Sequence, residues 1–317
     1  MTLDLAHTWE QALAEADVAA PTRRRYLGVL RDFLVWFEAR NHEPFSPARL
    51  TPIDLTGYRA HRQAAGQSPS TVNVAVCALR KFADWLVESG QRDEDVARRF
   101  KMVGTQAPLA PKALTPAATN ALIRESQQGR HAARNEALVQ LLLQTGLRIG
   151  EGAALVVGDL TIRARAGQVV VRAGKGNKHR VVPLNASARA ALVSYLAECW
   201  GVEDTLTAVL AVWDEHDPAA PLWVSQKGGR LHVRSLGKVI EELVASCARR
   251  GLVPADTTPH TLRHTFAATY LASNPGDLVG LAALLGHTTL ETTKIYVQPT
   301  QANLAARVEG SSLNAYG

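Results

Sequence analysis

The sequence contains only three cysteines in 317 residues, Cys77, Cys199 and Cys247. They are widely spaced and odd in number, so they form neither a disulfide framework nor the spacing of a metal site. Hydrophobic runs of the roughly 20 residues needed to span a membrane are also missing. The first residues lack the basic start and apolar core of a signal peptide. We therefore expect a cytoplasmic protein.

The composition is that of a folded protein, with 46% hydrophobic and 20% charged residues. The length is sufficient for two domains that each bury a core. The formal net charge of +6 mildly favours a polyanionic partner, although many cytosolic proteins are as basic.

The first third of the chain shows helical periodicity of its apolar residues. It predicts helices at about 21–40, 52–65 and 69–89, and a short one at 94–100. We expect a helical domain over residues 1–102, then a linker over 103–114 that carries two prolines and little periodicity. Candidate DNA contacts in this domain are Arg23, Arg24, Arg25, Arg80 and Lys81.

The first three of these arginines occupy the expected first turn of a helix, where positive charge opposes the helix dipole. A bound phosphate would relieve that conflict, because helix N-termini bind anions. A solvated basic turn is the alternative interpretation.

The remaining residues, 115–317, mix helical and strand patterns. Strands are predicted at 159–165, 168–173 and 178–184. Helices are predicted from 115, at 132–145, 185–199, 233–250, 259–274 and 278–285. The acidic segment 201–221 has no clear pattern, and we treat it as an insertion without an assigned role.

Several charged residues in this part require a partner. Arg148 follows a buried helix that ends at Gly146, and its partner is either Glu151, three residues on, or a ligand phosphate. Lys175 lies at the tip of a hairpin turn, where it is either solvated or suited to a DNA groove. The hairpin also carries Arg172, Lys178 and Arg180, which are further candidate DNA contacts.

Two further segments contain candidate site residues. His260 and Arg263 are three apart on a predicted helix, so they can act on one anion, whereas we expect His264 to point elsewhere and to serve packing. Further on, His287 follows the end of an apolar helix, and Tyr296 comes nine residues later. A single tyrosine in such a position is usually a packing residue.

The order of these motifs is specific: Gly-Leu-Arg-x-x-Glu, Gly-Lys-Gly-Asn-Lys, Pro-His-x-Leu-Arg-His, Leu-Leu-Gly-His and the tyrosine. It resembles the tyrosine recombinase (phage integrase) family, in layout the Xer-type members. The resemblance covers essentially the whole chain. It implies a mainly α fold with a small antiparallel β-sheet: a helical, SAM-like core-binding domain, and a mixed α/β catalytic domain over residues 115–317.

The resemblance also implies a role for each motif residue. Tyr296 would attack the scissile phosphorus, with His260 as its base, directly or by positioning. Arg148 and Arg263 would hold the non-bridging oxygens, and His287 would donate a third hydrogen bond. Lys175 would protonate the leaving oxygen, and Glu151 would orient Arg148 or a neighbour. No metal or other cofactor is expected.

The implied partner is double-stranded DNA with a specific recombination site. Family members act as homotetramers on two duplexes through a Holliday junction, and we expect a monomer or weak association without DNA. The C-terminal tail docks either on its own domain or on a neighbouring subunit. The rival interpretations are a type IB topoisomerase and a DNA-binding accessory protein.

Overall fold

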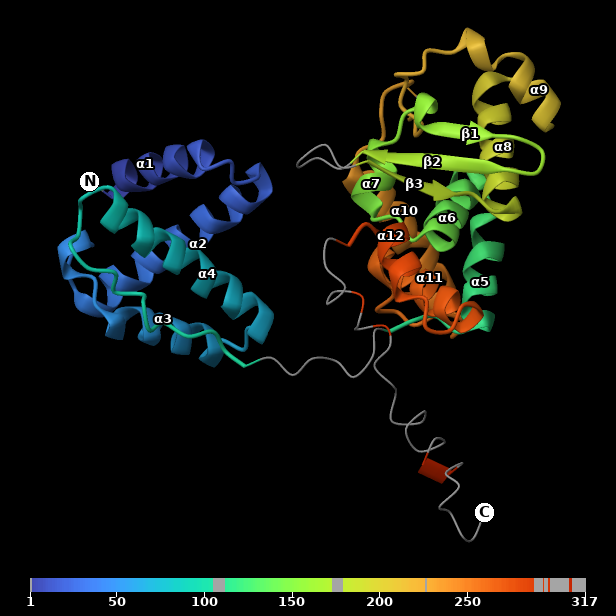
Figure 1. Cartoon of the computed structure of the whole chain (residues 1–317). Coiled ribbons are helices and arrows are strands. Elements are labelled where there is room, and N and C mark those ends of the chain that lie inside the picture. The colour runs from blue at the N-terminus through green and yellow to red at the C-terminus, as the bar shows by residue number, and fades with distance from the viewer. Residues whose placement is uncertain are drawn as a thin grey trace. The chain divides into compact units, whose positions relative to one another are not determined.

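The computed structural model describes residues 2–104, 112–172, 179–225 and 227–287, together with 293, 296, 308 and 309. The chain divides into two compact units, residues 1–107 and 108–317 (Figure 1). We describe each unit separately.

The first unit is helical. Its helices are α1 (Thr2–Glu15), α2 (Ala20–Asn41), α3 (Pro52–Ala64) and α4 (Pro69–Glu88). Helices α3 and α4 each begin with a side-chain cap followed by proline, Thr51 before Pro52 and Ser68 before Pro69. The helices enclose a core rich in aromatic side chains, among them Trp9, Phe33, Phe37, Phe45 and Phe82.

In this unit one helix was not predicted, and one predicted helix is wrong. Helix α1 was not predicted, although Trp9 and Leu13 are four residues apart and both are 1% exposed. Conversely, residues 94–100 form turns and not a helix. The Asp95 carboxylate accepts the backbone N–H of Ala97 at 2.7 Å, and such a local side-chain bond competes with helical hydrogen bonding.

The second unit contains a three-stranded antiparallel sheet and the remaining helices. The strands β1 (Leu160–Ile162), β2 (Gly167–Arg172) and β3 (His179–Pro183) lie in chain order. Val169 of the central strand pairs with Leu160 and with Val182. The three predicted strands are confirmed, with shorter ends. The helices are α5 (Pro116–Ser126), α6 (Ala132–Thr145), α7 (Ile149–Ala154), α8 (Ala186–Trp200), α9 (Leu206–Ala211), α10 (Val233–Ala248), α11 (Pro259–Ser273) and α12 (Leu278–Leu285).

Helix α6 is the centre of this unit. It packs against α5, α8 and α11 (Figure 1), and Leu138, Leu141 and Leu142 are fully buried. Burial on all sides explains why its sequence is apolar around most of the helix. The C-terminus of α6 leads through Gly146 directly into α7, so the position of this turn is fixed by the core.

The acidic segment 201–221 is folded against the domain. Val209 of α9 is fully buried, and the backbone of Val156 bridges to that of Pro221. The His216 ring stacks on Trp200 with 4.0 Å between ring centroids. The segment is therefore a packed part of the unit, and its role stays unassigned.

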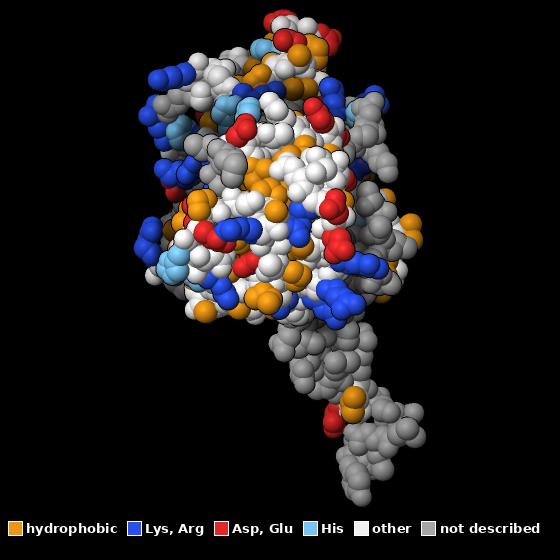
Figure 2. Space-filling model, turned by 90° about the vertical axis from the view of Figure 1, so that its left-hand side faces the viewer, with side chains coloured by type: hydrophobic (Ala, Val, Ile, Leu, Met, Phe, Trp, Pro, Cys, Tyr) orange, Lys and Arg blue, Asp and Glu red, His pale blue; other side chains and the backbone are white. Residues whose placement is uncertain are grey.

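The surface charge is mixed. On the face drawn in Figure 2, Lys and Arg side chains lie among acidic and hydrophobic ones and form no single continuous patch. Among the described helices, none is long and apolar enough to cross a membrane. On this face surface charge alone therefore does not identify a functional site, and specific contacts provide the evidence for one.

Candidate active site

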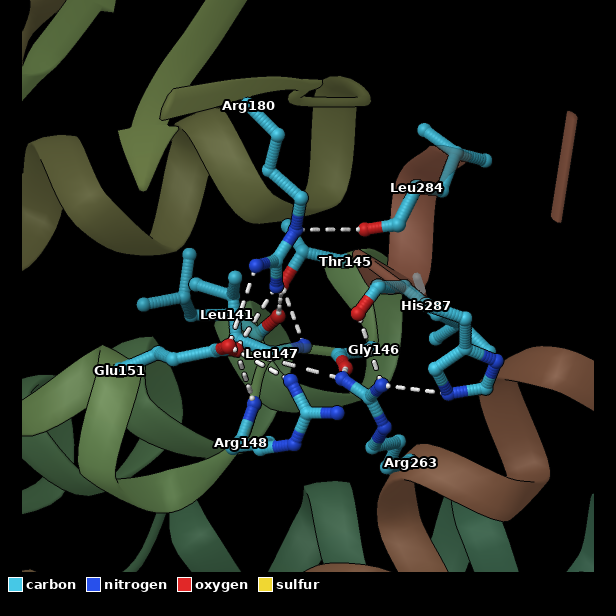
Figure 3. Close-up of polar contacts among 11 residues, drawn as sticks. Leu141, Thr145, Gly146, Leu147, Arg148, Glu151, Arg180, Arg263, Leu284 and His287 are labelled. Atoms are coloured by element: carbon cyan, nitrogen blue, oxygen red, sulfur yellow. Dashed lines mark hydrogen bonds and ion pairs between the residues drawn. The ribbon is translucent and has the colours of Figure 1, made fainter. Parts of the chain in front are cut away.

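One carboxylate, that of Glu151 in the first turn of α7, is shared by several arginines (Figure 3). Arg148 precedes the helix and donates its backbone N–H and its Nη1 to Glu151, each at 2.8 Å. Arg180 from β3 forms a two-pronged pair with both carboxylate oxygens, at 3.0 and 2.7 Å. The Nη1 of Arg263 from α11 lies 4.0 Å from the same group. Three elements distant in sequence thus meet at one acid.

These contacts keep Glu151 ionised. Burial alone would raise the pKa of its carboxyl, but the hydrogen bonds from Arg180 and Arg148 outweigh burial and lower the pKa to about 2. The carboxylate therefore balances one of the three guanidinium charges at all ordinary pH values. The described group retains an excess of positive charge, which is the charge balance expected of a site for an anion.

Arg263 is fixed by two helix ends. Its Nη1 donates to the carbonyl of Gly146 at 2.6 Å, and its Nη2 to the carbonyl of Leu285 at 2.8 Å. These carbonyls terminate α6 and α12, where the helix dipole is negative. The side chain is 5% exposed. Burial, with the nearby charge of Arg148, lowers the pKa of Arg263 to about 10, so the group stays charged at neutral pH.

Arg180 is also directed inward. Its Nε donates to the carbonyl of Leu284 at 2.9 Å, and its side chain is 13% exposed. Arg180 was expected to contact DNA as part of the basic hairpin. In the structure its guanidinium orients Glu151 and the end of α12, a role not visible from the sequence.

Two glycines permit this close packing. Gly146 and Gly286 end α6 and α12 with φ of 64° and 66°, in the left-handed region that favours glycine. A Cβ on Gly146 would lie 2.3 Å from a ring carbon of Phe266, and one on Gly286 would lie 2.7 Å from Nη1 of Arg180. The arginine cluster therefore depends on both helix ends having no side chain.

His287 connects the arginines with the segment that carries the tyrosine. Its Nε2 lies 3.0 Å from Nη2 of Arg263, and because arginine only donates, Nε2 is the acceptor. Nδ1 then carries the hydrogen and donates to Oγ1 of Thr293 at 2.9 Å. Burial and the positive charges of Arg263, Arg148 and Arg180 lower the pKa of His287 to about 4. The imidazole is neutral and both nitrogens are engaged, so it must exchange a partner before it can donate to a phosphate.

Tyr296 lies beside this cluster. Its hydroxyl is 3.0 Å from Nδ1 of His264, and its backbone N–H donates to the Thr293 carbonyl at 3.1 Å. Burial raises the pKa of the phenol, although the charges of Arg263 and Arg148 oppose that shift. The tyrosine is therefore protonated at neutral pH.

His264 was expected to point away from the other site residues, and this expectation is wrong, because its imidazole contacts the Tyr296 hydroxyl. His260 is exposed. The two histidines are four residues apart, a spacing that places both on one face of a helix. That four-residue spacing is the signal in the sequence that could have placed His264 near the site, as the three-residue spacing placed Arg263 with His260.

Other predicted site residues lie apart from this cluster or outside the described residues. Lys175 and Lys178 belong to residues 173–178, which lie outside the described residues. Most of the tail after Tyr296 also lies outside them. Arg172 forms an ion pair of 2.8 Å with the buried Asp159. Arg80 donates to the Phe100 carbonyl. Arg23, Arg24 and Arg25 are the fourth to sixth residues of α2, so they extend beyond the first turn in which they were expected, and Lys81 lies on α4.

A metal site was not expected from the sequence. Among the described residues, no group of three or more His, Cys, Asp or Glu side chains is placed to hold a metal ion. Metal-free chemistry stays a prediction.

Comparison with known proteins identifies relatives of both units. The phage integrase family matches residues 112–303, and the phage integrase N-terminal SAM-like domain matches residues 6–90. A tyrosine recombinase XerC of Methylobacterium sp. strain 4-46 is 34% identical, with 96% of this chain and 91% of that protein covered. A tyrosine recombinase XerD of Halalkalibacterium halodurans is 31% identical, with 82% and 81% covered.

Solved structures agree in fold. The XerH site-specific recombinase bound to difH substrate in a pre-cleavage complex aligns with a TM-score of 0.69 at 21% identity, over 97% of this chain and 84% of that one. A lambda integrase dimer bound to a core site aligns with a TM-score of 0.63 at 13% identity, over 91% and 96%. The predicted fold class, mainly α with a small antiparallel sheet, is confirmed.

Proposed function

The chain belongs to the phage integrase family of tyrosine recombinases, enzymes that cleave and rejoin DNA, and from this premise we propose that it is a site-specific recombinase. It would cut each strand through a 3′-phosphotyrosyl intermediate and exchange strands through a Holliday junction, without ATP or metal. The rival type IB topoisomerase is disfavoured because the recombinase relatives match both units along most of the chain.

One observation carries the proposal. The guanidiniums of Arg148, Arg180 and Arg263 surround the single carboxylate of Glu151, and the Tyr296 phenol lies close enough for two of these arginines to affect its pKa. An excess of positive charge beside a protonated phenol suits a phosphodiester, whose charge grows in the pentavalent transition state. Arg148 is the most accessible of the three, with a side chain 43% exposed.

The proposed reaction begins with attack by the Tyr296 oxygen on phosphorus. The phenolic O–H bond and the bond from phosphorus to the 5′-oxygen break, and a phosphotyrosyl ester forms. Arg148 and Arg263 would neutralise the non-bridging oxygens, and Lys175 would protonate the departing 5′-oxygen. His260 stays the predicted base, directly or by positioning. The ester is close in energy to the diester it replaces, so rejoining is the same step reversed.

The proposed partner is double-stranded DNA carrying a specific site, bound by a homotetramer that joins two duplexes. The contact between Tyr296 and His264 of the same chain supports attack in cis, in which each subunit uses its own tyrosine.

The test replaces Tyr296 with phenylalanine, which removes one oxygen and keeps the ring. The variant should bind DNA selected by the wild-type protein and form no covalent adduct on a nicked suicide substrate, measured by a shift on a denaturing gel. Adducts that persist in Y296F would contradict the assignment. Relaxation of supercoiled plasmids that lack the selected site would instead favour the topoisomerase.

A further inference from the structure

The hydroxyl of Tyr296 contacts the imidazole of His264. It also lies near the Arg263 guanidinium, whose charge and hydrogen bond act to lower the pKa of the phenol. The Nδ1 to Oη distance is 3.0 Å, within the range of a good hydrogen bond. The ring centroids are 5.5 Å apart at 53°, so the contact is edge-on and not a stack. The imidazole is therefore aimed at the one atom of the tyrosine that the proposed reaction uses.

The protonation states of the two groups allow the phenol to donate this hydrogen bond. Burial, with the charges of His260 and Arg263, lowers the pKa of His264, so the ring is neutral at pH 7. The phenol is protonated because burial raises its pKa. A neutral imidazole carries one ring hydrogen, and in the tautomer with that hydrogen on Nε2 its Nδ1 accepts the phenolic O–H.

The tyrosine is also connected through its backbone to Arg263, one of the clustered arginines. Its backbone N–H bonds to the carbonyl of Thr293, whose hydroxyl bonds to His287, and His287 in turn bonds to Arg263. Arg263 and His264 are consecutive residues of α11. The contacts therefore form a closed circuit that starts and ends on one turn of this helix and contains Tyr296.

We propose that His264 is a further residue of the reaction, which positions the nucleophile by accepting the hydrogen bond of the Tyr296 hydroxyl. This inference rests on the proposed function. The bond sets the rotation of the O–H, so that a lone pair of the oxygen is free to face phosphorus while the hydrogen points to α11. The neutral ring performs this role without adding another positive charge to the arginine cluster.

The test compares three substitutions of His264 in the full-length protein. His264→Phe keeps an aromatic ring for packing and removes the acceptor. His264→Asn keeps the Cβ and Cγ atoms and can place its amide oxygen, Oδ1, close to the position of Nδ1. Thr269→Ala, at an exposed position of the same helix, is the control for a change on α11.

The measurement is the single-turnover rate of covalent adduct formation on a nicked substrate that carries the selected site. H264F should be slowed about tenfold, the rate change expected when one ordinary hydrogen bond is lost from the transition state. H264N should recover most of the wild-type rate, and T269A should match wild type. DNA binding and thermal unfolding, measured in parallel, should be unchanged in all three.

A second substrate separates the nucleophile from the leaving group. Replacing the bridging 5′-oxygen with sulfur makes a leaving group that needs little protonation, since a thiol has a pKa of about 8.5. The H264F defect should persist on this substrate, because the defect is on the tyrosine side. Recovery of H264F on the sulfur substrate would overturn the proposal.

The remaining outcomes are equally decisive. Equal rates in H264F and H264N would show that the acceptor atom is irrelevant. A wild-type or faster rate in H264F would mean that His264 only packs against the tyrosine or restrains it. Absence of adducts in the wild-type protein, by contrast, would count against the proposed function and not against the role of His264 in particular.

Discussion

The arginine side and the tyrosine side of the site are held in different ways. Arg263 and Arg180 are buried and bonded to helix-end carbonyls, to Glu151 and to His287. Tyr296 contacts His264 through its hydroxyl and Thr293 through its backbone, and it packs against the buried cluster of Ala267, Leu281 and Leu285. The arginine side is thus tied to the folded core by buried hydrogen bonds, whereas the described contacts of the tyrosine lie at its partly buried edge. Substitutions on the arginine side should therefore lower both stability and activity, whereas substitutions on the tyrosine side should lower activity alone.

The largest effect is expected from Arg263→Ala compared with Arg148→Ala. Both should lose roughly 100-fold or more in cleavage, the usual consequence of removing one charge-stabilising donor. R263A should also lose about 3–5 kcal/mol of stability, because it leaves two buried carbonyls and Glu151 short of a partner. R148A, whose side chain is 43% exposed, should lose no more than about 1 kcal/mol.

Urea unfolding and adduct formation on the same protein samples provide both readouts. Equal stability of R263A and R148A would contradict the distinction between a buried and an accessible arginine. Near-normal cleavage by R148A would mean that this residue serves only Glu151.

A smaller effect is expected from the pH dependence of Glu151. Its pKa is about 2 in the folded chain and 4.5 ordinarily, so the folded state favours the carboxylate. The stabilisation is complete above pH 4.5 and declines as the pH falls toward 2. Linkage places it at about 3 kcal/mol, reduced by whatever the neutral form retains of its hydrogen bonds.

Glu151→Gln is the matched control, because it removes the charge and keeps the shape. The difference in unfolding free energy between wild type and E151Q should be constant between pH 6 and 7 and should shrink from pH 5 downward. If the difference in unfolding free energy is independent of pH, the charge of Glu151 does not contribute to stability through its pairs with the arginines.

The smallest effect is expected from Gly286→Ala, compared with Gly276→Ala. Both glycines have positive φ, of 66° and 86°, so each substitution should cost about 1–2 kcal/mol of stability. Only at Gly286 does the new Cβ meet Arg180, whereas nothing lies within 4 Å at Gly276. G286A should therefore also slow cleavage and G276A should not, measured by adduct formation. Equal cleavage rates in the two variants would show that the end of α12 does not position the arginine cluster for cleavage.

The comparison also explains what the sequence could and could not predict. Helices with a cap and a proline, such as α3 and α11, and the break at Gly146 follow from local rules, and these predictions are confirmed. Arg148 and Glu151 are neighbours in sequence, so their pairing was one of two stated alternatives. The inward turn of Arg180 depends on residues about 30 and 100 positions away, and no local pattern contains it.

The tyrosine side was predicted less well. His264 was given a packing role because the bond to Tyr296 joins two segments 32 residues apart. Thr293, fully buried and bonded to His287, was not named at all. In the first unit, α1 was missed because its buried residues are few, and a local Asp95 contact replaced the helix expected at 94–100. Long-range contacts and local side-chain bonds therefore account for these errors.

The most direct test of the account is to locate the residue that becomes joined to DNA. Trypsin cleaves after Lys294 and Arg307, so the peptide 295–307 contains Tyr296 and none of the other five tyrosines. Mass spectrometry of the trapped adduct should show a nucleotide phosphate on this peptide, attached at Tyr296. Attachment to any other residue would contradict the proposal that Tyr296 is the nucleophile.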